Sequence, residues 1–283
     1  MSEGGQPFTL EALIKVTRFW NLVIVGLAQF FTAYFLVGYF TVLDWRLYVL
    51  SASTIVIAAG GYIINDYYDV KIDLINKPDR VVIGKSMRRR YALFFHTSLT
   101  ITGVALGLLL NWKIALINFL SGFLLWLYSN LLKRKPFIGN FTIAVLTGLS
   151  VYLVAALYNP FNKFILLYSF FSFFITLLRE IIKDMEDWKG DTTFGCQTLP
   201  ILWGMRKTKW FIYFLIATNT ILILYFNQTQ VGLPGWIIPV FILLPVFFLI
   251  YRLTTADTIK DFSNLSLYCK FILLIGVFSM VFV

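Results

Sequence analysis

Long apolar stretches alternate with short polar ones along most of the chain. Nine stretches are dominated by hydrophobic side chains, and each approaches the ~20 residues that a helix needs to span a bilayer. The pattern therefore predicts an all-α, polytopic membrane protein with nine transmembrane helices and no linker between soluble domains. The stretches cover residues 19–40, 47–64, 91–110, 114–131, 139–158, 164–183, 210–227, 236–252 and 265–283.

The composition leads to the same class. Hydrophobic residues make up 59% of the chain, aromatic residues 18% and charged residues 13%, and the mean hydropathy is +0.79. An ordinary soluble domain has about a quarter of its residues charged, so a soluble globule is excluded. The first residues, MSEGGQPF, lack the basic and short apolar regions of a cleavable signal. Cys196 and Cys269 are too few for a disulfide framework and are expected to be free thiols or packing residues.

The net charge of +10 indicates the orientation of the chain rather than an affinity for nucleic acid. If the N-terminus is cytoplasmic, nearly all of the 24 Lys and Arg residues fall on the cytoplasmic side of the predicted helices, and the exceptions are Arg46, Lys113 and Lys163. Basic residues accumulate in the cytoplasmic loops of membrane proteins. We therefore expect a multi-pass protein of the cell membrane with a cytoplasmic N-terminus and no nucleic-acid partner.

Two acidic segments stand out in this apolar chain. NDYYDVKID, residues 65–73, and KDMEDWKGD, residues 183–191, each carry three aspartates at positions i, i+3 and i+7, and each opens a long cytoplasmic loop. On a helix of 3.6 residues per turn these positions fall within about 60° of one another, so each set is expected on one helical face. The matched spacing suggests a pseudo-repeat, as in membrane folds built from related halves. The aspartates are Asp66, Asp69, Asp73, Asp184, Asp187 and Asp191.

Carboxylates gathered this densely repel one another unless cations lie between them. Their oxygens favour Mg²⁺ over zinc, and the sequence has a single histidine, His96, and no Cys–His set. Mg²⁺ held by a few carboxylates completes its shell with water and phosphate oxygens, which predicts a diphosphate substrate. Basic groups are expected to help hold it.

Two other interpretations of the acidic segments stay open. They could be solvated loop segments without a ligand, or part of a proton or cation pathway, which would make the protein a transporter. A pathway requires acidic groups in mid-membrane, whereas the predicted helices at 91–110, 114–131, 139–158 and 210–227 contain none.

The sequence around these aspartates resembles the UbiA-type superfamily of intramembrane prenyltransferases over nearly the whole chain. That superfamily carries an Asn-Asp-x-x-Asp motif after its second helix and an Asp-rich motif after its sixth, where this chain has NDYYD and REIIKDMEDWKGD. The stretch Arg18-Phe-Trp-Asn21 is similar to the superfamily's Arg-Pro-x-Asn. One stretch departs from the pattern, because Arg80-Val-Val-Ile-Gly84 lacks both prolines of the family form Arg-Pro-Ile/Leu-Pro-x-Gly.

Within the superfamily, the phrases NDYYDVKIDLINKPDR, YSNLLKR, GNFTIAVLTG and REIIKDMEDWKGD most resemble the digeranylgeranylglyceryl phosphate synthases. This implies Mg²⁺-dependent transfer of a prenyl group, expected to be geranylgeranyl, from prenyl diphosphate to the hydroxyl of a prenylglyceryl phosphate, which forms an ether lipid. The alternative is prenylation of an aromatic quinone precursor or a chlorin-type acceptor. The expected partners are the prenyl diphosphate, a lipid-like acceptor and membrane lipids, with no obligate protein partner.

The resemblance also implies roles for individual residues. Four aspartates would hold two Mg²⁺ ions, and the asparagine that begins the first motif would donate a neutral oxygen. The last aspartate of each segment would complete or orient the coordination shells. Tyr128 is expected to stabilise the allylic cation or to orient the leaving group. The metal ligands implied are Asn65, Asp66, Asp69, Asp184 and Asp187, and Asp73, Asp191 and Tyr128 complete the catalytic set. The residues expected to bind the substrate are Lys133, Lys183, Arg80, Arg18 and Asn21.

The implied fold is a single membrane-embedded domain, residues 1–283, with its nine helices around a central cavity that opens at the cytoplasmic side. Gly60 and Gly61 are expected to permit close helix packing, or alternatively to let a substrate approach the backbone. The run Arg88–Arg90 either binds an acceptor phosphate or interacts with anionic headgroups. His96 is expected to be a buried packing partner rather than a base.

Overall fold

The computed structural model describes residues 10–228, 236–237 and 239–283, and most of these residues are helical. No strand occurs in this part of the chain, where one isolated bridge pairs Ile83 with Met87. Within it, eight helices are long and apolar enough to cross a membrane, and Val240–Thr254 forms a shorter apolar helix. The prediction of an all-α polytopic membrane protein is confirmed, and the predicted number of nine is reached only when the shorter helix is counted as a span.

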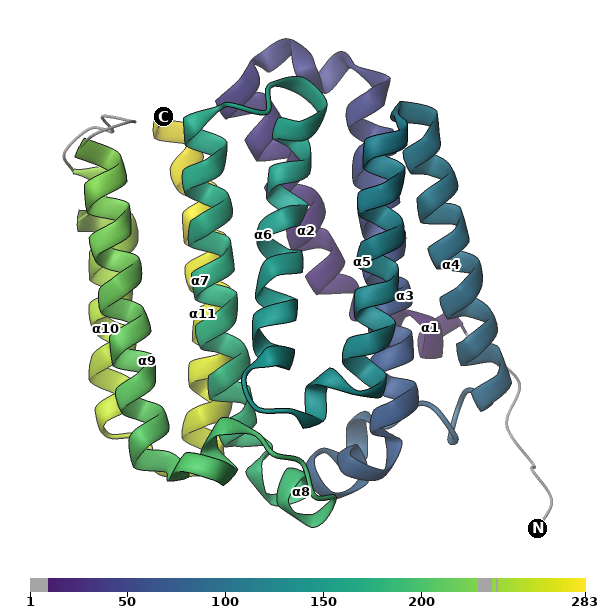
Figure 1. Cartoon of the computed structure of the whole chain (residues 1–283), viewed down its shortest axis with the longest axis vertical. Coiled ribbons are helices and arrows are strands. Elements are labelled where there is room, and N and C mark those ends of the chain that lie inside the picture. Colours follow the sequence, from purple (N-terminus) through teal and green to yellow (C-terminus); the bar gives the residue numbers. More distant parts are fainter. Residues whose placement is uncertain (1–9, 229–235, 238) are drawn as a thin grey trace. The chain divides into compact units, whose positions relative to one another are not determined.

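Figure 1 shows the order of the helices along the chain. Short π and 3-10 elements lie between the α-helices or follow the last one. These elements are η1 (Thr32–Val37), η2 (Tyr39–Leu43), η3 (Pro78–Arg80), η4 (Leu132–Arg134), η6 (Pro239–Leu243) and η7 (Met280–Phe282). The α-helices are α1 (Leu10–Val16), α2 (Phe19–Phe31), α3 (Trp45–Asn76), α4 (Arg89–Leu110), α5 (Trp112–Asn130), α6 (Ile138–Tyr158), α7 (Lys163–Glu186), α8 (Trp188–Thr193), α9 (Leu199–Phe226), α10 (Leu244–Thr254) and α11 (Ile259–Ser279).

Several helices begin at polar residues that satisfy their first backbone N–H groups. The side-chain oxygens of Asn111 and Asn162 accept hydrogen bonds from the third residues of α5 and α7, at 2.9 and 3.1 Å. Thr258 and Asp261 form a capping box at the start of α11. Pro200 lies in the first turn of α9, where a missing N–H costs no hydrogen bond.

The described helices differ from the predicted boundaries where polar residues continue a helix. The apolar run at 47–64 was expected to end the second span, but α3 continues through the first acidic segment to Asn76. Helix α9 begins at Leu199 rather than near residue 210 and bends at Gly204, whose φ of 79° departs from helical geometry. A hydropathy pattern detects the part of a helix that lies in the membrane and misses a polar extension of the same helix.

The contacts divide the chain into two compact units. The first unit comprises residues 1–26 and 45–133, and the second unit comprises residues 27–44 and 134–283. The prediction of one membrane-embedded domain over residues 1–283 stays a prediction, as does the central cavity.

In the first unit, α3 packs against both α4 and α5, which also pack against each other. A Cβ added at Gly60 would lie 3.3 Å from the backbone oxygen of His96, and one added at Gly61 would lie 2.7 Å from Leu125. Helices in a membrane associate through such close van der Waals packing, so the prediction that these glycines permit it is confirmed. His96 is buried, and its Nδ1 lies 3.0 Å from the backbone oxygen of Gly60, which fits a packing role.

In the second unit, α7 is the central helix and packs against α6, α9 and α11. Its buried face is continuous and apolar, with Phe171, Ile175, Leu178 and Ile182 in the main core of the unit. A Cβ added at Gly148 of α6 would lie 2.9 Å from the backbone oxygen of Ser169, so α6 and α7 are in direct backbone contact at that point. Charged residues appear on the last turns of α7 from Arg179 onward, beside core residues such as Ile182.

Candidate active site

The first acidic segment occupies the polar end of α3. Asp66, Asp69 and Asp73 lie on this one unbroken helix, as their spacing predicted. Asn65 and Asp69 are buried, and the amide Nδ2 of Asn65 donates a 2.8 Å hydrogen bond to Oδ2 of Asp69, one helical turn further on. Because a buried carboxylate needs bonding partners, this amide helps to fix the orientation of Asp69.

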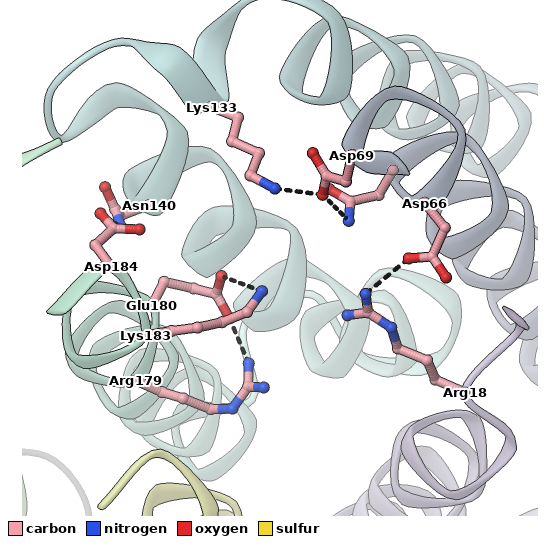
Figure 2. Close-up of polar contacts among 10 residues, drawn as sticks. Arg18, Asp66, Asp69, Lys133, Asn140, Arg179, Glu180, Lys183 and Asp184 are labelled. Atoms are coloured by element: carbon pink, nitrogen blue, oxygen red, sulfur yellow. Dashed lines mark hydrogen bonds and ion pairs between the residues drawn. The ribbon is translucent and has the colours of Figure 1, made fainter. Parts of the chain in front are cut away.

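Arg18 is the cationic partner of Asp66. Its Nη2 donates a 2.8 Å hydrogen bond to Oδ1 of Asp66, and its guanidinium carbon lies 5.0 Å from the centre of the Tyr62 ring (Figure 2). Burial alone would lower the pKa of Arg18, but the charge of Asp66 and the neighbouring Tyr62 outweigh burial and raise it above its ordinary value. The backbone of Arg18 has a φ of 53°, which L-residues rarely adopt unless the surroundings hold them there.

Lys133 is the cationic partner of Asp69. It lies on η4, just beyond the end of α5, and its Nζ forms an ion pair with Oδ2 of Asp69 (Figure 2). Burial alone would lower the pKa of Lys133, but the charge of Asp69 and then the neighbouring Tyr128 and Asp73 raise it well above its ordinary value. Lys133 therefore stays an ammonium throughout the neutral pH range. Tyr128 is buried at the end of α5, which places it beside this ion pair.

The second acidic segment is divided by the end of a helix. Asp184 lies on α7, Asp187 is the residue at which α7 ends, and Asp191 lies on the short α8. The prediction that all three project from one helical face is therefore wrong. The backbone of Asp187, with ψ near 4°, breaks the helix, and Asp191 is buried. The i, i+3, i+7 spacing alone did not reveal this break.

The described hydrogen bond to Asp184 comes from a neutral group, whereas Asp66 and Asp69 each form an ion pair with a basic side chain. The amide Nδ2 of Asn140, from α6, donates a 2.8 Å hydrogen bond to Oδ2 of Asp184. The two basic residues at this end of α7 pair with Glu180 instead. Nη1 of Arg179 forms an ion pair with Oε1 of Glu180, and Nζ of Lys183 lies 3.9 Å from Oε2.

Asn140, Arg179 and Glu180 were not predicted as site residues. Glu180 had a detectable signal, because it precedes Asp184 by four residues and Asp187 by seven, and these intervals place residues on one face of a helix. Asn140 had none beyond its presence in the GNFTIAVLTG phrase, since its partner is 44 positions away.

Two further residues, Asn21 and Arg80, were predicted to bind the substrate. Asn21 is half-buried on α2, and its backbone N–H donates a 2.8 Å hydrogen bond to the carbonyl of Arg18. Arg80 ends η3, and its side chain lies outside the described part of the structure.

The basic residues near Arg80 organise the loop that follows α3. Lys15 and Lys85 donate hydrogen bonds to the backbone oxygens of Asp79 and Pro78, at 3.0 and 2.9 Å. The guanidinium carbon of Arg89 lies 4.5 Å from the centre of the Tyr67 ring. These cations therefore hold the loop in position, and an acceptor-binding role for the run Arg88–Arg90 stays a prediction.

The donor groups suit a hard divalent cation. Among the described residues, no three His, Cys, Asp or Glu side chains are placed together as a ready-made metal site. Each unit nevertheless presents a carboxylate oriented by an asparagine amide, Asp69 with Asn65 and Asp184 with Asn140. Mg²⁺ takes few protein ligands and fills the remaining positions with water and phosphate oxygens, so these residues fit it.

The fold defines the class, a multi-pass helical membrane protein, and carboxylates and basic side chains gather at the ends of its helices. A family model described as the UbiA prenyltransferase family matches residues 23–275. The chain belongs to this family and is a prenyltransferase of the membrane.

Relatives and solved structures agree with the assignment. Digeranylgeranylglyceryl phosphate synthase from Thermococcus gammatolerans is 31% identical over 271 residues, which cover 95% of this chain and 97% of the relative. A solved structure described as that of digeranylgeranylglyceryl phosphate synthase in membranes has a TM-score of 0.72 and 26% identity, covering 96% of this chain and 97% of that one. A UbiA homologue from Archaeoglobus fulgidus, bound to GPP and Mg²⁺, shares the fold with a TM-score of 0.69 and 15% identity, covering 95% of this chain and 99% of that one.

Proposed function

We propose that this prenyltransferase moves a geranylgeranyl group from its diphosphate to the hydroxyl of a prenylglyceryl phosphate and so forms an ether lipid. The observation that carries the proposal is the pairing of Asp66 with Arg18 and of Asp69 with Lys133. A complex of divalent cations with a diphosphate can replace both ion pairs. The metal ions bind the carboxylates, and the diphosphate oxygens accept hydrogen bonds from the basic side chains. The similarity to digeranylgeranylglyceryl phosphate synthases supports the choice of acceptor.

We assign the metal-binding role to the predicted ligands of both acidic segments, which makes residues 1–283 one catalytic domain. Bound Mg²⁺ would neutralise the negative charge that grows on the diphosphate as its bond to the prenyl carbon breaks. Asp73 and Asp191 would orient the ligands beside them. The proposed ligands are Asn65, Asp66, Asp69, Asp184 and Asp187.

The basic residues bind the diphosphate in this proposal. Lys133 is charged at neutral pH and stands next to Asp69, so its ammonium needs only a small movement to reach a phosphate oxygen. Arg18 offers a planar donor pair that matches phosphate geometry, and Lys183 contributes from α7. Arg80 and Asn21 complete the proposed substrate-binding set.

The transfer itself needs little further chemistry from the chain. The C–O bond between the prenyl group and the diphosphate breaks, and the diphosphate leaves with the electron pair. The π-face of Tyr128 stabilises the allylic cation that remains. The acceptor hydroxyl then forms the ether C–O bond and releases its proton to an oxygen of the departing diphosphate, since an alcohol that attacks a carbocation needs only a weak base.

The orientation follows from the distribution of basic residues. With the N-terminus and both acidic segments on the cytoplasmic side, the predicted loops obey the positive-inside rule. A protease or maleimide-labelling assay on sealed cells, with single cysteines at Ser2 and Asn159, would test this. Labelling of the Ser2 position from outside the cell would reverse the orientation.

The direct test offers the purified protein radiolabelled geranylgeranyl diphosphate and a panel of acceptors. The expected product is an ether lipid formed from geranylgeranylglyceryl phosphate in the presence of Mg²⁺, with none formed in EDTA. Transfer only to an aromatic acceptor would overturn the proposed acceptor. Undiminished turnover in EDTA would overturn the metal assignment.

A further inference from the structure

The cationic side chains are distributed differently in the two units. In the first unit, Arg18 and Lys133 pair directly with aspartates of the acidic segment. In the second unit, Arg179 and Lys183 both pair with Glu180, which is not one of the aspartates. Glu180 therefore adds a carboxylate beside the proposed metal-binding segment.

Glu180 holds two cations at once. Only 6% of its surface is exposed, and its two oxygens face different partners, Oε1 toward Arg179 and Oε2 toward Lys183. Figure 2 shows the ammonium of Lys183 extended toward Glu180 rather than toward Asp184. One carboxylate therefore takes up both basic groups of this helix end.

Because Glu180 pairs with Arg179 and Lys183, neither basic group forms an ion pair with Asp184. Its described hydrogen bond comes from the neutral amide of Asn140, and no ion pair to it occurs among the described residues. A half-buried carboxylate without a direct ion-pair partner is costly, and an arriving divalent cation supplies that partner. If Lys183 lay on Asp184 instead, the metal would first have to displace an ammonium.

The guanidinium of Arg179 is itself incompletely bonded. Its Nε is buried and has no hydrogen-bond partner among the described residues. A buried donor without an acceptor carries an energetic cost, and a side chain with a purely structural role would be expected to satisfy it.

We propose that Glu180 is a positioning residue that keeps Lys183 and Arg179 away from Asp184, so that the second acidic segment binds a divalent cation before the diphosphate arrives. The inference rests on the metal dependence of the proposed function. In the first unit, Asp66 and Asp69 bind metal only after they release Arg18 and Lys133. This release requires a diphosphate that binds the two basic side chains. The two segments therefore load in a fixed order.

The test measures binding of Mn²⁺, as a spectroscopic substitute for Mg²⁺, to the purified full chain without substrate, by electron paramagnetic resonance. Glu180→Gln is expected to weaken Mn²⁺ binding by about tenfold or more, as loss of a group that orients metal ligands commonly does. The control is Glu186→Gln on the same helix. Glu186 is equally buried, with 7% of its surface exposed, but it lies on another helical face, so its affinity is expected to stay near that of the wild type.

A second pair of variants separates a local effect from a change in net charge. The double variant E180Q/K183M removes the ammonium that Glu180 held and is expected to restore most of the Mn²⁺ affinity. The double variant E180Q/K189M has the same net charge but removes the exposed Lys189 of α8, and it is expected to bind as weakly as E180Q. A merely structural role for Glu180 would not give this difference between the two double variants.

The outcomes separate this inference from the proposed function. Weak binding in E180Q with rescue only by K183M supports the positioning role. Wild-type Mn²⁺ affinity in E180Q, equal rescue by both double variants, or an absence of Mn²⁺ binding before substrate while turnover still needs Mg²⁺ would each overturn the inference alone. Turnover that continues in EDTA would overturn the proposed function, and the inference with it.

Discussion

The two acidic segments have the same aspartate spacing and different surroundings. The first lies on the continuous helix α3, and its aspartates Asp66 and Asp69 are already neutralised by basic side chains. The second is divided between α7 and α8, and Asp184 has a neutral amide partner while the nearby cations are held by Glu180. The same aspartate spacing thus occurs once with two aspartates in ion pairs, and once with Asp184 bonded to a neutral amide.

The difference shows what each segment requires from a ligand. The first must give up two ion pairs before a metal can bind, and an anion has to accept the released cations. In the second, Asp184 has no ion pair to give up among the described residues. Two segments with the same aspartate spacing can therefore act differently, because the neighbouring basic residues determine whether each carboxylate is already in an ion pair before a ligand binds.

The largest expected effect comes from removing one aspartate of either segment. Asp66→Ala and Asp187→Ala should each abolish prenyl transfer, because each would remove part of a charge stabilisation worth several kcal/mol. At 1.36 kcal/mol per factor of ten, this corresponds to about a thousandfold or more in rate. The measurement is product formation from radiolabelled geranylgeranyl diphosphate by purified variants that insert normally into membranes.

Asp257→Ala serves as the control, because Asp257 is an exposed carboxylate paired with Lys209. Its activity should match the wild type. If Asp66→Ala were inactive and Asp187→Ala retained full turnover, the second segment would have no part in the reaction.

The next largest effect is expected from Lys133→Met. Loss of one partner of a buried charge pair costs about 2–5 kcal/mol, so kcat/KM for the prenyl diphosphate should fall by about a hundredfold. Binding of Mn²⁺ without substrate should become tighter in the same variant, because Asp69 is released. The exposed Lys135 provides the control Lys135→Met, and parallel losses in both measurements would contradict the exchange of partners.

Arg18 should show a smaller effect, because its ion pair is more exposed to solvent than that of Lys133, with side-chain exposures of 32% and 20%. Arg18→Gln is expected to raise KM for the prenyl diphosphate about tenfold, the lower end of what a charge-assisted contact contributes. Arg18→Lys keeps the charge but loses the planar donor pair, so it should recover only part of the affinity. Full recovery by lysine would mean that charge alone matters at this position.

The smallest effect concerns packing in the two units. In Gly148→Ala the new Cβ would meet a backbone oxygen of Ser169 at 2.9 Å, whereas in Gly61→Ala it would meet the flexible side chain of Leu125. A backbone atom cannot move aside, so Gly148→Ala should destabilise the protein by about 1–3 kcal/mol and Gly61→Ala by less. Thermal unfolding in detergent measures both, and a larger loss for Gly61→Ala would reverse the comparison.

The sequence predicted those parts of the molecule that depend on local periodicity. The hydropathy pattern predicted the apolar helices, and the spacing of Asp66, Asp69 and Asp73 predicted their common helix. The same spacing failed for Asp184, Asp187 and Asp191, because the break at Asp187 depends on how α7 ends and not on the distance between aspartates.

The partners of the aspartates could not be predicted in the same way. The pairing of Asn140 with Asp184 joins two helices, and no local signal reports a contact across 44 positions. Glu180 shares the periodicity of the acidic segment, yet its role depends on both of its oxygens being occupied by cations. Lys133 was predicted as a substrate-binding residue, and its ion pair with Asp69 required coordinates.

The most direct test of the central claim is the position of the metal ions with a substrate analogue bound. Crystals grown with Mn²⁺ and a non-reactive prenyl thiodiphosphate would show the metals by their anomalous scattering. The account predicts Mn²⁺ ions that bridge one diphosphate to carboxylates of both acidic segments, with Lys133 turned from Asp69 to a phosphate oxygen. Metal ions bound by one segment alone, or a diphosphate held without metal, would contradict it.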